Sequence, residues 1–309
     1  MKVSIIGSGA VGTTLAQRVL ESGIADVVLL DVLKNVACAK SLDLLDASSI
    51  VGHERNIIGT DNYKDVESSE IVVITAGFPR KPGMTREELV SKNGSIVKEV
   101  SNNIKIYAPY SILIVVTNPL DAMTYLAYKV TGFKPARVFG MAGILDESRF
   151  IYLAANELKV KRSSIETFVL GSHGDTMVPI LSKTRVSGKP ISSLVPKARL
   201  EEIVKRTRGR GAEIVSLLGS GSAYYSPSAA VFRMIKAVLN DTGETMTVSA
   251  HLDGEYGLRD ICIGVPCRIG KSGIKKIVEL DLSEEERGAL HKSGQAIKDS
   301  YETSHKLDI

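Results

Sequence analysis

The first half of the chain alternates short apolar runs with longer stretches of helical periodicity. The apolar runs are rich in β-branched residues, and they cover Val3–Ile6, Val27–Leu30, Ile71–Thr75 and Ile112–Val116. Such near-continuous runs are typical of strands that are covered on both faces. Helical patterns lie between them, over Val11–Glu21, Val36–Asp46 and Arg86–Ala108. This alternation predicts a parallel sheet with helices on both sides, joined by right-handed crossovers.

The second half has a different rhythm, which begins near residues 141–146. Its helical patterns cover Asp146–Glu157, Ala198–Leu218, Pro227–Leu239 and Ser283–Ser300. Its strand-like runs cover Ile165–Leu170, Met246–Ala250 and Ile261–Ile269. We therefore expect an α/β protein, with a doubly wound parallel-sheet domain over residues 1–143 and an α+β domain over residues 144–309.

The composition is that of an ordinary globular protein with room for two domains, since 44% of the 309 residues are hydrophobic and 24% are charged. The formal net charge is only +4. We interpret the basic run Lys205–Arg210 as a solvated helix face or turn rather than as a nucleic-acid-binding patch. Apolar stretches stay below the ~20 residues of a membrane span, and Met1 leads directly into the first predicted strand without a signal peptide. We expect a cytoplasmic protein without nucleic-acid or membrane partners.

The three cysteines, Cys38, Cys262 and Cys267, follow no regular spacing, and their odd count argues against a disulfide framework. No histidine stands beside Cys262 or Cys267, so a zinc site is not expected. We interpret these residues as small buried apolar side chains and expect no metal.

The first predicted strand leads into Gly-Ser-Gly-Ala-Val-Gly, which fits the dinucleotide-binding pattern G-x-G-x-x-G. In that pattern Gly7 permits the tight turn, Gly9 lets the backbone approach a pyrophosphate, and Gly12 allows the helix to pack closely on the strand. The free N–H groups of the helix that starts here point at the phosphates. Glycines also mark plain turns, but the strand before and the helix after favour a Rossmann phosphate loop. Its candidate cofactor-binding residues are Gly7, Ser8, Gly9, Ala10, Val11 and Gly12.

The second predicted strand is followed at once by Asp31. An aspartate at this position accepts hydrogen bonds from the adenosine ribose and repels a 2′-phosphate, which favours NAD over NADP. No arginine follows Asp31 to bind such a phosphate, although Lys34 is close. A capping aspartate beside a glycine turn is the structural alternative.

His173 lies in Gly-Ser-His-Gly-Asp, at the end of an apolar run. A lone histidine is more often structural, but the flanking glycines open space around this one. Asp146 and Arg149 are three residues apart, so they share one face of a predicted helix. A helix-start aspartate with an i, i+3 ion pair remains the alternative interpretation.

Two further segments follow predicted parallel strands. Pro79–Arg86 combines prolines, a glycine and cations in an exposed loop, and Asn118 closes the next strand. Ligands bind beyond the carboxyl ends of the strands in such sheets. A solvated basic loop and a turn asparagine before a proline are the alternatives.

Together and in this order, these motifs resemble the lactate/malate dehydrogenase family over essentially the whole chain. The motifs are GSGAVG from Gly7, Asp31, TAGFPRKPGMTR from Thr75, VTNPLDAM from Val116, LDESR from Leu145 and GSHGD from Gly171. Within the family, the chain is similar to the lactate-dehydrogenase-like malate dehydrogenases. The resemblance implies a Rossmann domain followed by an α+β catalytic domain.

The resemblance also implies a role for each matched residue. His173 would accept the proton of the substrate hydroxyl, and Asp146 would hold its imidazole and stabilise the charged form. Arg149 would bind the C1 carboxylate through its planar guanidinium, and Arg86 would polarise the reacting carbonyl. Asn118 would donate a hydrogen bond to the substrate oxygen.

Cofactor contacts are implied for four further matches. The main chain of Val116 and Thr117 would lie beside the nicotinamide, with Asn118 next to it. Asn93 matches a position that contacts the cofactor in the family. The implied cofactor is NAD.

Arg80 and Ala223 indicate the substrate. Lactate dehydrogenases typically have glutamine where Arg80 stands, and malate dehydrogenases have arginine. A distal carboxylate in a closed site needs a counter-charge, because an unpaired buried ion costs several kcal/mol. The lactate pattern also has threonine where Ala223 stands, so this pocket leaves more room. We expect malate and oxaloacetate as the substrate pair.

Three alternatives remain beside malate dehydrogenase. The first is a lactate dehydrogenase, which Arg80 and Ala223 oppose. The second is an NAD-dependent glycosidase on a related fold, which would need metal ligands that this sequence lacks. The third is a catalytically inactive NAD-binding module, which the retained histidine, aspartate and arginines oppose. The resemblance further implies a homo-oligomer, and we expect a tetramer rather than a dimer.

Overall fold

The computed structural model describes residues 1–78 and 86–305 of the chain. Its first half contains the parallel strands and their connecting helices. They are β1 (Lys2–Ile6), α1 (Ala10–Glu21), β2 (Asp26–Leu30), α2 (Lys34–Val51), β3 (Ile57–Thr60), β4 (Ile71–Ile74), α3 (Arg86–Tyr107), β5 (Ile112–Val115), α4 (Leu120–Thr131) and β6 (Val138–Gly140).

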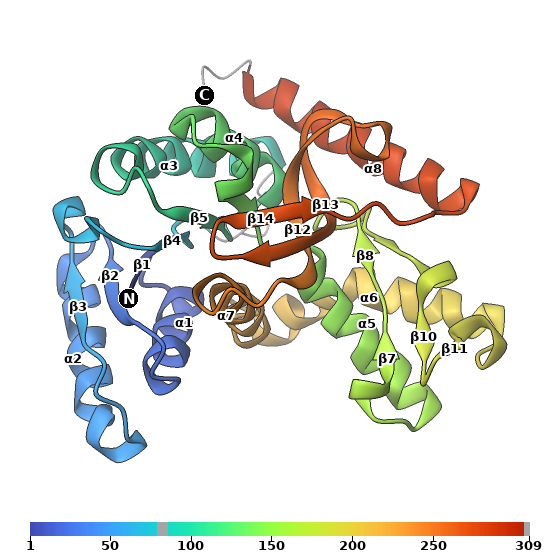
Figure 1. Ribbon diagram of the computed structural model, residues 1–309, viewed down its shortest axis with the longest axis horizontal. Helices are drawn as coiled ribbons and strands as arrows, with labels where there is room; N and C mark the ends of the chain where they lie inside the picture. The colour runs from blue at the N-terminus through green and yellow to red at the C-terminus, as the bar shows by residue number, and fades with distance from the viewer. Residues whose placement is uncertain (79–85, 306–309) are drawn as a thin grey trace.

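These strands form the parallel sheet that the sequence predicts. They lie side by side in the order β3-β2-β1-β4-β5-β6, and each pair of neighbours is parallel. β4 and β5 are buried along their whole length, because helices cover the sheet on both faces. Figure 1 shows α3 and α4 on one face and α1 on the other. The prediction of a doubly wound sheet is confirmed.

The second half combines longer helices with antiparallel strands. The main elements are α5 (Gly143–Leu158), α6 (Lys197–Leu218), α7 (Tyr225–Leu239), β12 (Glu244–Asp253), β13 (Arg259–Gly270), β14 (Gly273–Ile277) and α8 (Glu284–His305). Five two-residue strands complete it, namely β7 (Ile165–Glu166), β8 (Val169–Leu170), β9 (Val178–Pro179), β10 (Arg185–Val186) and β11 (Lys189–Pro190).

In both halves, single turns of 3₁₀ helix occur at Tyr63–Val66, Pro135–Arg137, Arg162–Ser164, Leu181–Lys183, Ile191–Ser193 and Glu255–Gly257.

The two halves share one sheet. β12 pairs with β6 in antiparallel orientation at Ser249 and Gly140, and this junction extends the sheet to nine strands in the order β14-β13-β12-β6-β5-β4-β1-β2-β3. α7 also returns to the first half, where it packs on α1. The α+β character of the second half is confirmed, and its meander β12-β13-β14 lies at the centre of Figure 1.

The predicted strand Ile165–Leu170 is wrong as a single element. Its two ends belong to different sheets, because β7 pairs with β10 whereas β8 pairs with β9. Between them, the hydroxyl groups of Thr167 and Thr184 share a hydrogen bond of 2.8 Å in the interior. The apolar pattern identified an extended segment, but it carried no information about which neighbour each end would bind.

Cysteine burial is largely as predicted. Cys262 and Cys267 lie on β13 and are completely buried, whereas Cys38 on α2 is half-buried. The basic run Lys205–Arg210 forms part of α6, where Lys205 and Arg206 are exposed, so the prediction of a solvated helix face is confirmed. Among residues 1–78 and 86–305, no helix is long and apolar enough to cross a membrane.

Candidate active site

The Gly-rich turn joins β1 to α1 and leaves an open surface above it. Gly7 has φ of +110°, and a Cβ there would lie 2.6 Å from the Ala76 backbone nitrogen. A Cβ at Gly12 would collide with the carbonyl oxygen of Gly7, so only glycine allows α1 to start this close to the strand. A Cβ at Gly9 would meet no atom within 4 Å. The turn therefore fits a phosphate group that approaches the backbone over Gly9.

Asp31 stands beside this turn. Its Oδ2 accepts hydrogen bonds from the Ser8 backbone N–H (2.6 Å) and hydroxyl (2.8 Å), and its Oδ1 accepts one from the Leu33 N–H (3.0 Å). Partial burial opposes the charged form, but these hydrogen bonds outweigh it and lower the pKa of Asp31. The side chain is thus an ionised acceptor next to the phosphate loop, which fits an adenosine ribose.

Asn93 on α3 links the segments that follow β4 and β5. Its Oδ1 accepts a hydrogen bond from the Phe78 N–H (2.7 Å), and its Nδ2 donates to the carbonyl oxygens of Phe78 (3.2 Å) and Asn118 (2.6 Å). The side chain is 1% exposed, and both of its polar atoms are hydrogen-bonded to the main chain. Its implied contact with the cofactor stays a prediction.

The residues after β5 form a second edge of the site. Val116 and Thr117 are buried, and the Thr117 hydroxyl donates to the Ala76 carbonyl oxygen at 2.7 Å. Asn118 is exposed and lines the same cavity as His173. The structure therefore brings a side chain from the first half of the chain opposite the histidine of the second half.

His173, Asp146 and Arg149 form one connected group. Asp146 lies in the first turn of α5, and its side chain is 1% exposed. Its Oδ2 lies 2.8 Å from His173 Nδ1, and its Oδ1 accepts a hydrogen bond from Arg149 Nη1 at 3.2 Å. One carboxylate thus orients both the imidazole and the guanidinium, and it leaves His173 Nε2 for a substrate.

Electrostatics suit this group for proton transfer and anion binding. Burial alone would lower the pKa of His173, but the charge and hydrogen bond of Asp146 outweigh it and raise the pKa. Burial is also the main reason that the pKa of Arg149 is lowered. Among the described residues, the buried Arg149 Nε has no hydrogen-bond partner. A substrate carboxylate would supply one.

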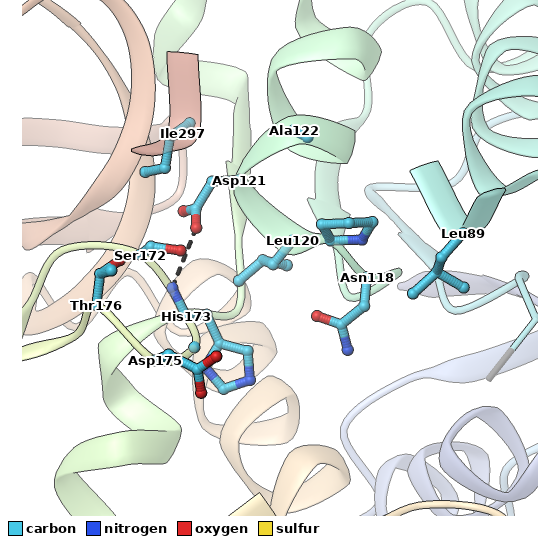
Figure 2. A pocket seen from close by; sticks show the side chains of 12 residues that line it. Leu89, Asn118, Leu120, Asp121, Ala122, Ser172, His173, Asp175, Thr176 and Ile297 are labelled. Atoms are coloured by element: carbon cyan, nitrogen blue, oxygen red, sulfur yellow. Dashed lines mark hydrogen bonds between the residues drawn. The ribbon is translucent and has the colours of Figure 1, made fainter. Parts of the chain in front are cut away.

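The cavity in front of His173 has a volume of about 200 Å³ and is shown in Figure 2. Its wall combines the polar residues Asn118, Asp121, Ser172, His173, Asp175 and Thr176 with the apolar Leu89, Pro119, Leu120, Ala122 and Ile297. A space of this size holds a molecule of a few heavy atoms, and polar and apolar walls fix its orientation.

Two predicted substrate-binding residues cannot be placed. Arg80 lies outside the described residues, and so does the side chain of Arg86, whose backbone begins α3. Sequence reasoning missed the buried carboxyl group of Asp121, which lines this cavity. Asp121 stands inside VTNPLDAM, a motif that drew attention for Asn118, and nothing in the sequence showed that it would reach His173.

Comparisons with known proteins cover the chain from end to end. Residues 1–140 match the lactate/malate dehydrogenase NAD binding domain, and residues 144–307 match the alpha/beta C-terminal domain of the same family. The chain is 49% identical over 304 residues to a malate dehydrogenase of Trichormus variabilis, covering 98% of this chain and 94% of that one. It is 47% identical over 306 residues to a malate dehydrogenase of Thermomicrobium roseum, covering 99% of each.

Solved structures give the same result. Malate dehydrogenase from Salinibacter ruber superposes with a TM-score of 0.95 at 41% identity, and the match covers 100% of this chain and 99% of that one. Lactate dehydrogenase from Cryptosporidium parvum, complexed with lactic acid and nicotinamide adenine dinucleotide, superposes with a TM-score of 0.95 at 37% identity, over 97% and 96% of the two chains.

Proposed function

Because the chain belongs to the lactate/malate dehydrogenase family, we propose that it is an NAD-dependent malate dehydrogenase, which interconverts (S)-malate and oxaloacetate. The His173–Asp146–Arg149 group supports this activity most directly, since it joins a proton acceptor to an anion-binding cation through one buried carboxylate. The relatives named malate dehydrogenase match the chain at 47–49% identity over nearly its whole length.

His173 moves the proton of the reaction. In malate oxidation its Nε2 accepts the proton of the C2 hydroxyl, while Asp146 stabilises the imidazolium that forms. In oxaloacetate reduction the imidazolium returns the proton to the carbonyl oxygen. The raised pKa of His173 favours the protonated form that reduction needs.

The substrate is held by cations and by an amide. Arg149 binds the C1 carboxylate, which gives its buried Nε a partner. Asn118, which lines the cavity together with His173, donates to the substrate oxygen, and Arg86 polarises the reacting carbonyl. Arg80 binds the distal carboxylate of malate, which distinguishes it from the methyl group of lactate.

NAD fits the residues around the Gly-rich turn. The open surface over Gly9 suits the pyrophosphate, and the ionised Asp31 suits an unphosphorylated ribose. Ser8, Ala10 and Val11 complete the turn, and Val116, Thr117 and Asn93 border the place of the nicotinamide. When bound, NAD supplies the hydride acceptor of the reaction.

One steady-state assay tests the proposal. The purified protein is given NADH with oxaloacetate, with pyruvate or with no keto acid, and NADH oxidation is measured. If the chain is a malate dehydrogenase, kcat/KM is highest with oxaloacetate. A preference for pyruvate would assign the chain to lactate dehydrogenase instead, and NADH binding without oxidation would indicate an inactive module.

We also propose that the protein is a homotetramer that works in the cytoplasm. Apolar side chains on α2 are exposed in the single chain, including Leu42 at 63% and Ile50 at 86%, and a subunit contact would cover them. The free cysteines suit a reducing compartment. Light scattering tests the assembly. A dimer would contradict the tetramer but still support a homo-oligomer, and a monomer would contradict both.

A further inference from the structure

We propose that Asp121 is a positioning residue, whose buried carboxylate holds the main chain of His173 so that the imidazole faces the substrate. Asp121 lies in the first turn of α4, three residues after Asn118, and no role was predicted for it. The inference rests on the proposed function, since it assigns a support to the base of that reaction.

The carboxylate accepts hydrogen bonds from several segments of the chain, and one of them comes from the side chain of Ser172, next to His173. Its Oδ2 accepts a hydrogen bond from the His173 backbone N–H at 3.1 Å, which is the dashed line in Figure 2. Its Oδ1 accepts one from the Ser249 hydroxyl on β12 at 2.7 Å. Asp121 is 3% exposed, so these contacts lie in the interior, where unpaired donors are costly.

α8 fixes Asp121 from a third direction. The Tyr301 hydroxyl, which is buried, donates to the Asp121 carbonyl oxygen at 2.9 Å. The backbone of Asp121 is thereby fixed by α8 and by its own helix, while its side chain reaches β12 and the loop of the base. A residue held in this way is a rigid point of attachment for that loop.

The sequence of the loop permits many conformations, so hydrogen bonds to its main chain decide where it lies. His173 stands between Gly171, which has φ of +87°, and Gly174, whose Cβ position would meet no atom within 4 Å. Asp146 orients the ring from α5, and the Ser172 N–H, which donates to Ser293 Oγ at 2.8 Å, holds the main chain one residue before the histidine. Asp121 fixes that main chain from α4, and both carboxylates together define where Nε2 lies relative to Asn118.

The experiment separates positioning from general support of the fold. Asp121→Asn keeps the length of the side chain and an oxygen that accepts from the His173 N–H, whereas Asp121→Ala removes both. The rate of NADH oxidation by oxaloacetate is measured in a single turnover, together with the dissociation constant of NADH and the melting temperature. The wild-type rate in the same experiment tests the proposed function independently.

We expect Asp121→Ala to slow the single turnover by about 10-fold to 100-fold with an unchanged NADH dissociation constant, since misplacement of a catalytic group by ~1 Å has effects of that order. Asp121→Asn should restore most of the rate. If Asp121→Ala does not fold, Asp121→Ser is used instead. The serine side chain is polar, but it is too short to reach the His173 N–H.

Thr124→Val is the matched control. It removes a buried hydroxyl from the same helix, whose partner is the Leu120 carbonyl oxygen at 2.8 Å and not the loop of His173. It should lower the melting temperature and leave the single-turnover rate unchanged. An active wild type together with a folded Asp121→Ala variant of equal rate would overturn the inference. Equal losses in Asp121→Asn and Asp121→Ala would overturn it as well.

Discussion

His173 and Asp146 are joined by a contact of 2.8 Å between Nδ1 and Oδ2, and this contact connects the loop after β8 to the first turn of α5. The second oxygen of the same carboxylate binds Arg149. The imidazole and the guanidinium therefore depend on one side chain, so a change at Asp146 alters both.

Replacement of His173 tests the base. His173→Asn should bind NADH nearly as well as the wild type and turn over about two to four orders of magnitude more slowly, which is the usual contribution of a general acid or base. NADH fluorescence gives the binding and steady-state kinetics give the turnover. His53→Asn, which replaces a buried imidazole whose Nδ1 accepts a hydrogen bond from the Arg55 N–H at 3.2 Å, is the control. Normal turnover in His173→Asn would remove this residue from the mechanism.

The pH dependence of oxaloacetate reduction reports the pairing of His173 with Asp146. Reduction needs protonated His173, so kcat/KM should fall as the pH rises through the raised pKa of this residue. Asp146→Asn removes the carboxylate that raises the pKa and leaves the burial that lowers it. The midpoint should then move to a lower pH. An unmoved midpoint would show that another group controls the profile.

Cofactor choice depends on Asp31. The wild type should strongly prefer NADH over NADPH, because the ionised carboxylate opposes a 2′-phosphate. In Asp31→Ser, kcat/KM with NADPH should rise and that with NADH should fall. Asp61→Ser removes an exposed carboxylate paired with Lys34 and serves as a control for surface charge. Equal wild-type efficiency with both cofactors would place Asp31 away from the ribose.

Substrate choice depends on Arg80. Arg80→Gln should lower kcat/KM for oxaloacetate by about two to four orders of magnitude, since a desolvated carboxylate without its partner costs roughly 3–5 kcal/mol. Pyruvate should gain, because the variant no longer buries an unpaired cation above its methyl group. Arg80→Lys keeps the charge and should retain most of the oxaloacetate preference. The measurement is the ratio of kcat/KM for oxaloacetate to kcat/KM for pyruvate. An unchanged ratio in Arg80→Gln would indicate that the guanidinium points to solvent and does not bind the distal carboxylate.

The buried carboxyl group of Glu147 should make stability depend on pH. Burial raises its pKa to about 7 in the folded protein, against 4.5 as the ordinary value. Between these values the folded state holds a proton that the unfolded state has lost, so stability falls as the pH rises through this range. Glu147→Gln should be more stable than the wild type by about 1–3 kcal/mol above pH ~7 and equal to it below pH ~4.5. Urea unfolding at fixed protein concentration measures this, and an equal difference at both pH values would contradict it.

Sequence periodicity predicted the elements whose burial is simple. The strands β1, β2, β4 and β5 were placed within one residue at each end, because both faces of each are covered and nearly every position is apolar. α4 was missed, although it spans twelve residues and buries seven of them. β3, β6 and β14 were missed because a glycine or polar residues interrupt the apolar run in each of them.

Site residues were predicted where their chemical type and sequence context mark them. They were missed where only the three-dimensional fold brings them to the site. A histidine between glycines and an aspartate three residues before an arginine are visible in the sequence. Asp121 becomes a support of His173 only because β12 and the loop of the base meet at α4, and sequence separations of 52 and 128 residues gave no hint of either contact.

The junction between β6 and β12 restricts how the protein can respond to a substrate. Gly140 and Ser249 pair across it, and Arg18 on α1 adds a second connection through its hydrogen bond to Ser228 on α7 at 3.1 Å. Rotation of one half against the other about residues 141–143 would break both. Closure of one half against the other, by which many two-domain proteins enclose a ligand, would therefore break both contacts. Exclusion of water from the reacting atoms has to come from short segments that rearrange on a fixed sheet.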